Sequence, residues 1–267
     1  MASRTYTARV LILRKTRLGE SDLILTMLAS DGQQLRAVAK GACKPTSSFA
    51  GRCELFCVCD VLCSVGKNLD ILKEARLLEG NTVIRSSLER SACAEVMMEL
   101  LDKITAAGLD NPKLFDVSTV ALRTMNDASV CNAPAICSAH LLKALAFSGF
   151  RPSTRECVVC GSECASSSTG DMIGFSINDG GVVCHNCRHE TEAMLLPVPL
   201  IAWIDTLLMS RFADIATMDI DLRVSYDVLQ FCQQWIRCHV ASNLKSLNAL
   251  FAYGIFDFES STSAPER

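Results

Sequence analysis

Hydrophobic and polar positions along the chain follow two different periods, one before and one after residue 81. In the first part, apolar and β-branched residues alternate with polar ones in runs that turn formers separate, which is typical of strands. Five strands are predicted, over residues 6–13, 23–29, 34–40, 54–65 and 69–77. Turns are predicted at Gly19-Glu20-Ser21-Asp22, Asp31-Gly32 and Gly66-Lys67-Asn68. Five short strands with no early crossover helix favour a small closed β-barrel.

After Asn81 the apolar residues recur at the helical spacing of three and four. Helices are predicted over residues 86–107, 111–125, 133–148, 197–208 and 222–251. Asn111-Pro112 supplies an N-cap and a first-turn proline, and Gly108 ends the preceding helix. The apolar stripe of the last helix is more typical of a core than of a ligand site. The predicted fold class is therefore α+β.

Two short cysteine pairs lie between the predicted helices, Cys157-x-x-Cys160 and Cys184-x-x-Cys187. This double spacing is typical of a tetrahedral zinc site with four thiolate ligands. The sequence between the pairs is rich in glycine, aspartate and asparagine, which fits a small β-ribbon. We therefore expect one structural Zn²⁺ per chain, since four protein thiolates leave no position open for a substrate.

Other interpretations of these cysteines are a disulfide, a redox pair or coincidence in a chain with 15 cysteines. Cys164, His185 and His189 are possible substitute ligands, but we expect each to be a bystander. Five further cysteines occupy the strand region, and small buried hydrophobes are the favoured interpretation over a second metal site. These five are Cys43, Cys53, Cys57, Cys59 and Cys63.

The predicted organisation is an N-terminal barrel followed by a helical domain into which the cysteine module is inserted. We expect the barrel over residues 1–80, the helical domain over 81–156 and 191–258, the zinc ribbon over 157–190 and a disordered tail over 259–267. A hydrophobic content of 49% is sufficient for sizeable cores. No export signal or run of eighteen apolar residues is evident, so a soluble protein of the reducing cytoplasm is expected.

The net charge of −3 conceals an asymmetry. Residues 1–80 hold 12 Lys or Arg against 8 Asp or Glu, whereas residues 81–267 hold 14 against 21. A basic barrel is a plausible binder of polyanions. We expect a nucleic acid to be held through its phosphates by the cations of this region, with ordinary solubilising charges as the alternative. The candidate residues are Arg14, Lys15, Arg17, Arg36, Lys40, Lys44 and Arg52.

Sequence signals for catalysis are weak. The glycines from Gly41 to Gly51 lack the Gly-Lys-Ser/Thr end of a P-loop, so nucleotide binding is not expected. His140 and His239 lie in predicted helices without a serine elbow or an acid partner at a recognisable spacing, and we expect them to be structural. No catalytic residue is assigned.

Several segments, taken in order, resemble the bacterial RecO family of DNA repair and recombination proteins. They are Gly19-Glu20-Ser21-Asp22-Leu23, Ala37-Val38-Ala39-Lys40-Gly41-Ala42, Glu54-Leu55-Phe56, and Ser148-Gly149-Phe150-Arg151-Pro152 leading into Cys157-Val158-Val159-Cys160-Gly161. The resemblance covers nearly the whole chain. It implies an OB-fold barrel, a helical domain with a zinc module, and a protein without enzymatic turnover that associates with the nucleoid during repair.

Members of the family bind single- and double-stranded DNA and anneal complementary strands. With RecR they help to load RecA onto strands coated by single-stranded DNA-binding protein, whose acidic C-terminal tail docks on the helical domain. The resemblance implies these partners here, and no membrane. This chain has a single lysine in Cys43-Lys44-Pro45-Thr46-Ser47-Ser48, where the family tends to carry a basic run. The alternative function is a zinc-ribbon interaction adaptor without direct DNA binding, and a zinc or thiol enzyme is the least favoured hypothesis.

Overall fold

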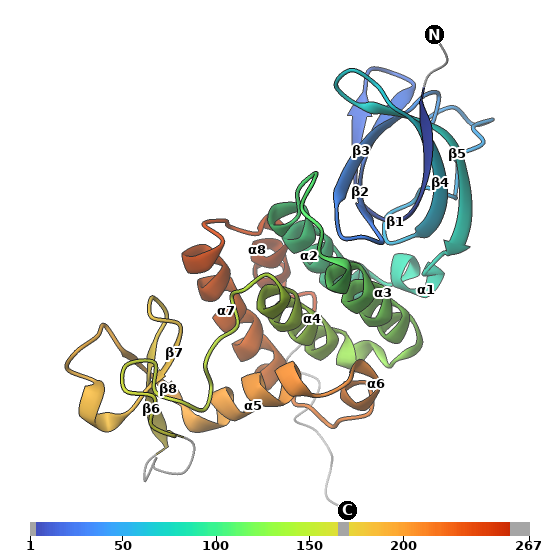
Figure 1. Cartoon of the computed structure of the whole chain (residues 1–267). Helices are drawn as coiled ribbons and strands as arrows, with labels where there is room; N and C mark the ends of the chain where they lie inside the picture. The colour runs from blue at the N-terminus through green and yellow to red at the C-terminus, as the bar shows by residue number, and fades with distance from the viewer. Residues whose placement is uncertain (1–3, 165–170, 257–267) are drawn as a thin grey trace, which may run out of the picture. The chain divides into compact units, whose positions relative to one another are not determined.

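The computed structural model describes residues 4–164 and 171–256, and the described residues form two compact units. One unit ends at Asp127 and the other begins at Ala128. The first holds the barrel and three helices, and the second holds the remaining helices and the cysteine module (Figure 1). The tail expected over residues 259–267 lies outside the described residues.

The first unit begins with a closed five-stranded barrel whose neighbouring strands follow the order β1-β2-β3-β5-β4. All pairings are antiparallel except β3 with β5, which is parallel. The strands are β1 (Thr5–Leu18), β2 (Asp22–Ala29), β3 (Gln34–Ala39), β4 (Val58–Ser64) and β5 (Asp70–Glu79). This closed five-stranded barrel is OB-like, as predicted.

Two strands differ in length from their predictions. The first continues to Leu18 because its second half pairs with β2, after a register shift between Ile12 and Arg14. The fourth begins at Val58 rather than at residue 54, since Phe56 has a φ of 68° that interrupts extended structure. Residues 40–57 therefore form a long connection between β3 and β4, hereafter the 40–57 connection.

The barrel core holds most of the cysteines of the strand region. Cys53, Cys57, Cys59 and Cys63 are buried in it among aliphatic side chains, which confirms their role as small hydrophobes. Cys43 is exposed, so the prediction was wrong for this residue. It lies in the 40–57 connection, outside the strands whose alternation determines which side chains enter the core.

The turn between β2 and β3 packs against the helical part of the first unit. Gly32 has a φ of +91°, and a Cβ atom there would lie 2.1 Å from the backbone carbon of Asn111. Gln34 donates from its backbone to the carbonyl of Ala106 at 3.2 Å and from its side-chain amide to Asp102 at 3.3 Å. This close approach requires glycine at the turn.

Three helices complete the first unit: α1 (Thr82–Ser86), α2 (Leu88–Ile104) and α3 (Pro112–Asp127). The predicted helix over 86–107 is shorter because Ser87 is extended and caps α2 by accepting from the Arg90 amide at 3.3 Å. The helix predicted from Asn111 is confirmed, with Pro112 as its first residue. Residues of α2 contact both α3 and β1.

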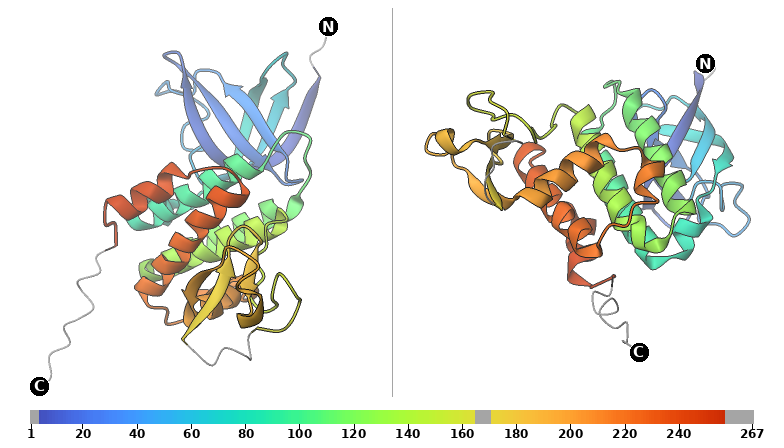
Figure 2. Two further views of the ribbon diagram at one scale, coloured as in Figure 1. Left: turned by 90° about the vertical axis from the view of Figure 1, so that its left-hand side faces the viewer. Right: turned by 90° about the horizontal axis from the view of Figure 1, so that it is seen from below.

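The second unit packs its helices around α4 (Ala133–Phe147), which is buried along most of its length. Contacts join α4 to α5 (Val198–Met209), α6 (Phe212–Ile215) and α7 (Leu222–His239), and the last helix is α8 (Lys245–Ala252). A small three-stranded sheet has the order β7-β6-β8, with β6 (Met172–Ser176), β7 (Gly181–Val183) and β8 (Met194–Pro197). Figure 2 shows this sheet leading directly into α5.

The single helix predicted over residues 222–251 is wrong, because the structure has two helices there. The first, α7, ends at His239, and the second, α8, begins at Lys245. Ala241 has a φ of 50°, a left-handed conformation that a continuing helix does not permit. The short α6 was not predicted from the sequence.

Residues 130–147 have the length and mean hydropathy, 1.3, of a membrane-spanning helix. Within the second unit 67% of this segment is buried, as is common for the core helix of a soluble protein. A single segment of this kind is weak support for membrane insertion.

The imidazole of His140 is completely buried at the centre of α4. Burial disfavours the charged ring and lowers its pKa to about 3, whereas an unfolded-chain histidine titrates near 6.5. As the pH falls below 6.5, the unfolded state takes up this proton before the folded state does. The contribution of His140 to stability is therefore complete above that pH and is lost progressively down to about pH 3.

We expect His140→Leu to remove this part of the pH dependence. Between pH 7 and pH 5 the wild-type free energy of unfolding should fall by about 2 kcal/mol more than that of the variant, since one pKa unit corresponds to about 1.4 kcal/mol. Denaturant unfolding at the two pH values measures the difference, and His185→Gln, at an exposed site, is the matched control. Equal pH dependence in wild type and His140→Leu would contradict the expectation.

Candidate metal centre and nucleic-acid interface

The structure brings the four cysteines of the two pairs together. The Sγ atoms of Cys157, Cys160, Cys184 and Cys187 all lie within 4.8 Å of one another. Those of Cys160 and Cys184 are 3.8 Å apart. A tetrahedron of sulfurs ~2.3 Å from a zinc ion has edges of about 3.8 Å, whereas a disulfide would need ~2.05 Å. The cysteines are free thiols in a geometry that fits a tetrahedral metal ion.

Each pair of cysteines lies in a tight turn. The backbone amide of Gly161 donates to the carbonyl of Cys157 at 2.8 Å, and Gly161 has a φ of +73°. In the second turn the amide of Cys187 donates to the carbonyl of Cys184 at 3.1 Å. The amide of Cys184 also donates to the sulfur of Cys157 at 3.3 Å, which joins the two turns. The short spacing thus directs all four thiols to one point.

The electrostatics of the four thiols favour a bound cation. Burial raises the pKa of Cys157, but nearby backbone amides, that of Cys184 foremost, lower it to about 6. The Ser162 hydroxyl lowers the pKa of Cys160, whereas thiol hydrogen bonds with Cys184 and Cys160 raise that of Cys187. Neighbouring thiolates repel one another, so the cluster can ionise fully only when a cation compensates the charge.

The proposed substitute ligands are not part of this cluster. Cys164 is buried and its thiol lies 3.7 Å from the Ser162 carbonyl, while burial raises its pKa to about 11. His185 and His189 are exposed. Within residues 4–164 and 171–256, no second group of three or more potential metal ligands gathers at one point.

Aromatic packing attaches the small sheet to the helices of the second unit. Phe175 of β6 contacts the rings of Phe231 and Trp235 on α7 edge to face, with centroids 5.4 and 5.9 Å apart. The ring of His239 lies tilted against that of Trp235, and its Nε2 lies 2.9 Å from the Ile177 carbonyl oxygen. A metal ion that orders the cysteine turns would therefore also support this contact with α7.

The barrel places some of its predicted DNA-binding cations around one hollow. Lys15 and Arg17 of β1 line a cavity of about 350 Å³ together with Phe49 and Cys43 of the 40–57 connection. Lys15 also forms an ion pair with Glu54 at 2.6 Å, whereas Arg17 is exposed. We call this cavity the aromatic hollow, since it combines two cations with an aromatic ring.

Lys40 and Lys44 lie in the 40–57 connection, which also lines the aromatic hollow. Both lysines are near the carboxylate of Asp22. The backbone amide of Gly41 donates to this carboxylate at 2.8 Å and, with the Ser21 hydroxyl, holds its pKa below the usual range. Both lysines add to the effect through their charge. They are exposed and remain accessible to a further anion.

The remaining predicted cations lie elsewhere on the first unit. Arg14 forms an ion pair with Asp102 of α2 at 3.3 Å. Arg36 is exposed on β3, opposite Thr26 of β2, and does not line the aromatic hollow. Arg52 lines a second cavity of the barrel. The structure therefore brings together only a subset of the seven residues.

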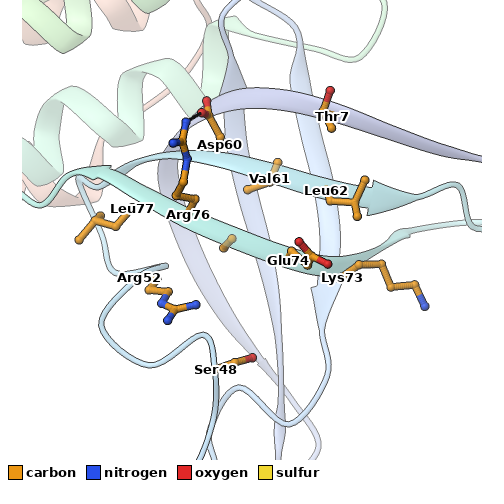
Figure 3. Close-up of a pocket in the computed structure, with 11 residues that line it drawn as sticks. Thr7, Ser48, Arg52, Asp60, Val61, Leu62, Lys73, Glu74, Arg76 and Leu77 are labelled. Carbon is orange, nitrogen blue, oxygen red and sulfur yellow. Dashed lines mark hydrogen bonds and ion pairs between the residues drawn. The ribbon is translucent and has the colours of Figure 1, made fainter.

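This second cavity lies along β4 and β5 and has a volume of about 760 Å³. We call it the β4–β5 groove (Figure 3). Lys73 and Arg76 of β5 line it with Arg52, and sequence reasoning missed both. The alternation over residues 69–77 places them among polar positions of that strand, but it does not reveal that the 40–57 connection supplies Arg52 to the same cavity.

The fold and the cysteine cluster together define a modular protein with an OB-like barrel, a helical region and a candidate structural metal centre. The family model for Recombination protein O N terminal matches residues 1–81, and that for Recombination protein O C terminal matches residues 85–248. The chain belongs to the Recombination protein O, or RecO, family of DNA repair proteins.

Curated relatives support this assignment. DNA repair protein RecO of Desulforamulus reducens is 27% identical over 91% of this chain and 93% of its own length. DNA repair protein RecO from a strain of Dehalococcoides mccartyi is 29% identical over 92% and 94%. That of Desulfitobacterium hafniense is 32% identical over 69% of this chain and 65% of its own. The resemblance expected from the sequence is thus confirmed.

Proposed function

We propose that the protein is a recombination mediator that binds single- and double-stranded DNA and anneals complementary strands, without enzymatic turnover. The observation that carries the proposal is the aromatic hollow, in which Lys15, Arg17 and Phe49 combine on an OB-like barrel of the RecO family. Cations that follow a backbone, with an aromatic ring for one unpaired base, form a common single-strand site on such barrels. Residues 1–80 act as the DNA-binding domain in this proposal.

The metal centre has a structural role in this proposal. One Zn²⁺ held by Cys157, Cys160, Cys184 and Cys187 would leave no coordination position open, because the four thiolates complete its tetrahedron. The metal would order the two cysteine turns and the sheet that packs on α7. It takes no part in DNA chemistry.

Protein partners are proposed for the helical unit. With RecR, the protein would help to load RecA onto strands coated by single-stranded DNA-binding protein, whose acidic C-terminal tail the helical unit receives. A cavity of about 380 Å³ on α5, lined by Pro199, Ala202, Trp203, Thr206 and Met218, is largely apolar and suits the apolar end of such a tail. A cytoplasmic location follows from this role.

Strand annealing tests the proposal most directly. Micromolar protein should retard a labelled single strand at low salt and accelerate pairing of complementary strands coated with the cognate single-stranded DNA-binding protein. When the coating protein lacks its C-terminal tail, the acceleration on coated strands should be abolished. Annealing of bare strands, which carry no coating protein, should still be accelerated. If the protein neither retards nor anneals bare DNA at low salt, the mediator proposal fails and the zinc-ribbon adaptor takes its place.

A further inference from the structure

The β4–β5 groove is shaped by two distant segments of the first unit. Lys73, Glu74 and Arg76 come from β5, while Ser48 and Arg52 come from the 40–57 connection (Figure 3). In the figure Arg76 points toward Asp60, and the nitrogen-to-oxygen distance is 2.6 Å. The groove is therefore a feature of the closed barrel and not of one strand.

Positive charge prevails in this groove. Asp60 is held between two arginines, since Arg9 forms an ion pair with its other oxygen at 3.0 Å. Its charge is thereby compensated, and the three cations that line the groove, Arg52, Lys73 and Arg76, are all exposed. Asp60 and Glu74 are the two carboxylates among the described lining residues, so the three cations exceed them by one.

The groove and the aromatic hollow lie against the same connection but differ in chemistry. Along the 40–57 connection, Ser48 and Arg52 line the groove, whereas Phe49 and Cys53 line the aromatic hollow. The described lining of the groove contains no aromatic ring, and its polar groups are three cations, the carboxylates of Asp60 and Glu74, and the hydroxyls of Thr7 and Ser48. Arginine, lysine and hydroxyl side chains are the usual partners of phosphate and sugar oxygens.

We propose that the β4–β5 groove is a second nucleic-acid site, which holds the phosphate backbone of the complementary strand during annealing. This inference rests on the proposed function and deepens it. The absence of a stacking ring among the described lining residues leaves the bases of that strand free to pair, while the first strand occupies the aromatic hollow. A site that contacts backbone alone also accepts the duplex product, because a paired strand presents the same phosphates.

The double variant Lys73→Glu with Arg76→Gln tests this assignment. Annealing of bare complementary 30-mers should slow about tenfold and duplex affinity should fall about tenfold, because two phosphate contacts are lost. Affinity for a 12-mer single strand should change less than twofold, since the aromatic hollow is intact. Asp60 keeps its ion pair with Arg9 in this variant, and thermal unfolding checks that the barrel is folded.

Two further variants complete the design. Lys67→Glu removes an exposed cation from the β4–β5 turn, outside both cavities, and should leave duplex affinity and annealing at wild-type values. Glu74→Lys adds charge to the groove and should raise duplex affinity at least threefold. Wild-type annealing in the double variant, with no gain from Glu74→Lys, would overturn the second site and leave the mediator function intact. Absence of DNA binding by the wild-type protein would overturn both.

Discussion

Replacing Cys157 with serine should release the metal and unfold the cysteine module. The serine hydroxyl is a poor ligand for a soft thiolate site, and three remaining cysteines cannot close the tetrahedron. Structural zinc contributes on the order of 10 kcal/mol in small modules, so the loss exceeds the stability that the short sheet supplies alone. The zinc content should fall from one tightly held ion per chain to less than about 0.1, and the environment of Trp235 should change.

Two cysteines provide matched controls for this variant. Cys131→Ser alters an exposed thiol in the same unit, and Cys164→Ser alters a buried one beside the cluster. Both should retain the metal, as Cys164 lies outside the group of four. Full metal content in Cys157→Ser would mean that Cys157 is not a ligand. Metal loss in Cys164→Ser would mean that Cys164 is needed to hold the metal. A disulfide joining either pair in reducing buffer would contradict the metal centre itself.

Neutralising Arg17, Lys40 and Lys44 to glutamine should weaken single-stranded DNA binding about a hundredfold at low salt. Each contact with a phosphate releases counterions, so the slope of log affinity against log salt should become less steep by about 2 for the three residues. The loss should be similar for all sequences, because backbone contacts carry no base information. Fluorescence anisotropy across a salt series measures both quantities.

A triple variant with equal charge loss elsewhere controls for net charge. Lys103→Gln, Lys113→Gln and Arg237→Gln remove three cations from helices, and this protein should bind with nearly the wild-type salt slope. Arg14 is omitted from the test set because its ion pair with Asp102 would make any loss ambiguous. An unchanged salt slope in the Arg17, Lys40 and Lys44 variant would mean that this face of the barrel does not bind DNA.

The sequence predicted most elements because local signals agreed with the packing. Alternation and turn residues defined the barrel strands, and Pro112 defined the start of α3. The break after His239 was hidden, since Ile236, Val240 and Leu244 keep helical spacing through it. Ala241 interrupts the helix with a left-handed conformation, which an alanine in the sequence does not indicate.

The candidate sites also differ in whether a local sequence signal reveals them. Four cysteines at a fixed double spacing are a local signal, and the structure brings all of them together. Cations on a barrel have no such signal, because their grouping depends on which strands meet across its closure. Arg14 and Lys15 are neighbours in sequence, yet they form ion pairs with Asp102 of α2 and with Glu54 of the 40–57 connection.

The turn at Gly32 bears on how the chain can be divided for experiments. A fragment ending at residue 80 would remove Asn111, against which Gly32 packs, and the Asp102 and Ala106 groups to which Gln34 donates. The backbone N–H and the side-chain amide of Gln34 would then lose their protein acceptors and face solvent. The barrel would also lose its contact with α2. A fragment ending at Asp127 keeps all of these partners, because that residue ends the compact unit to which the barrel belongs.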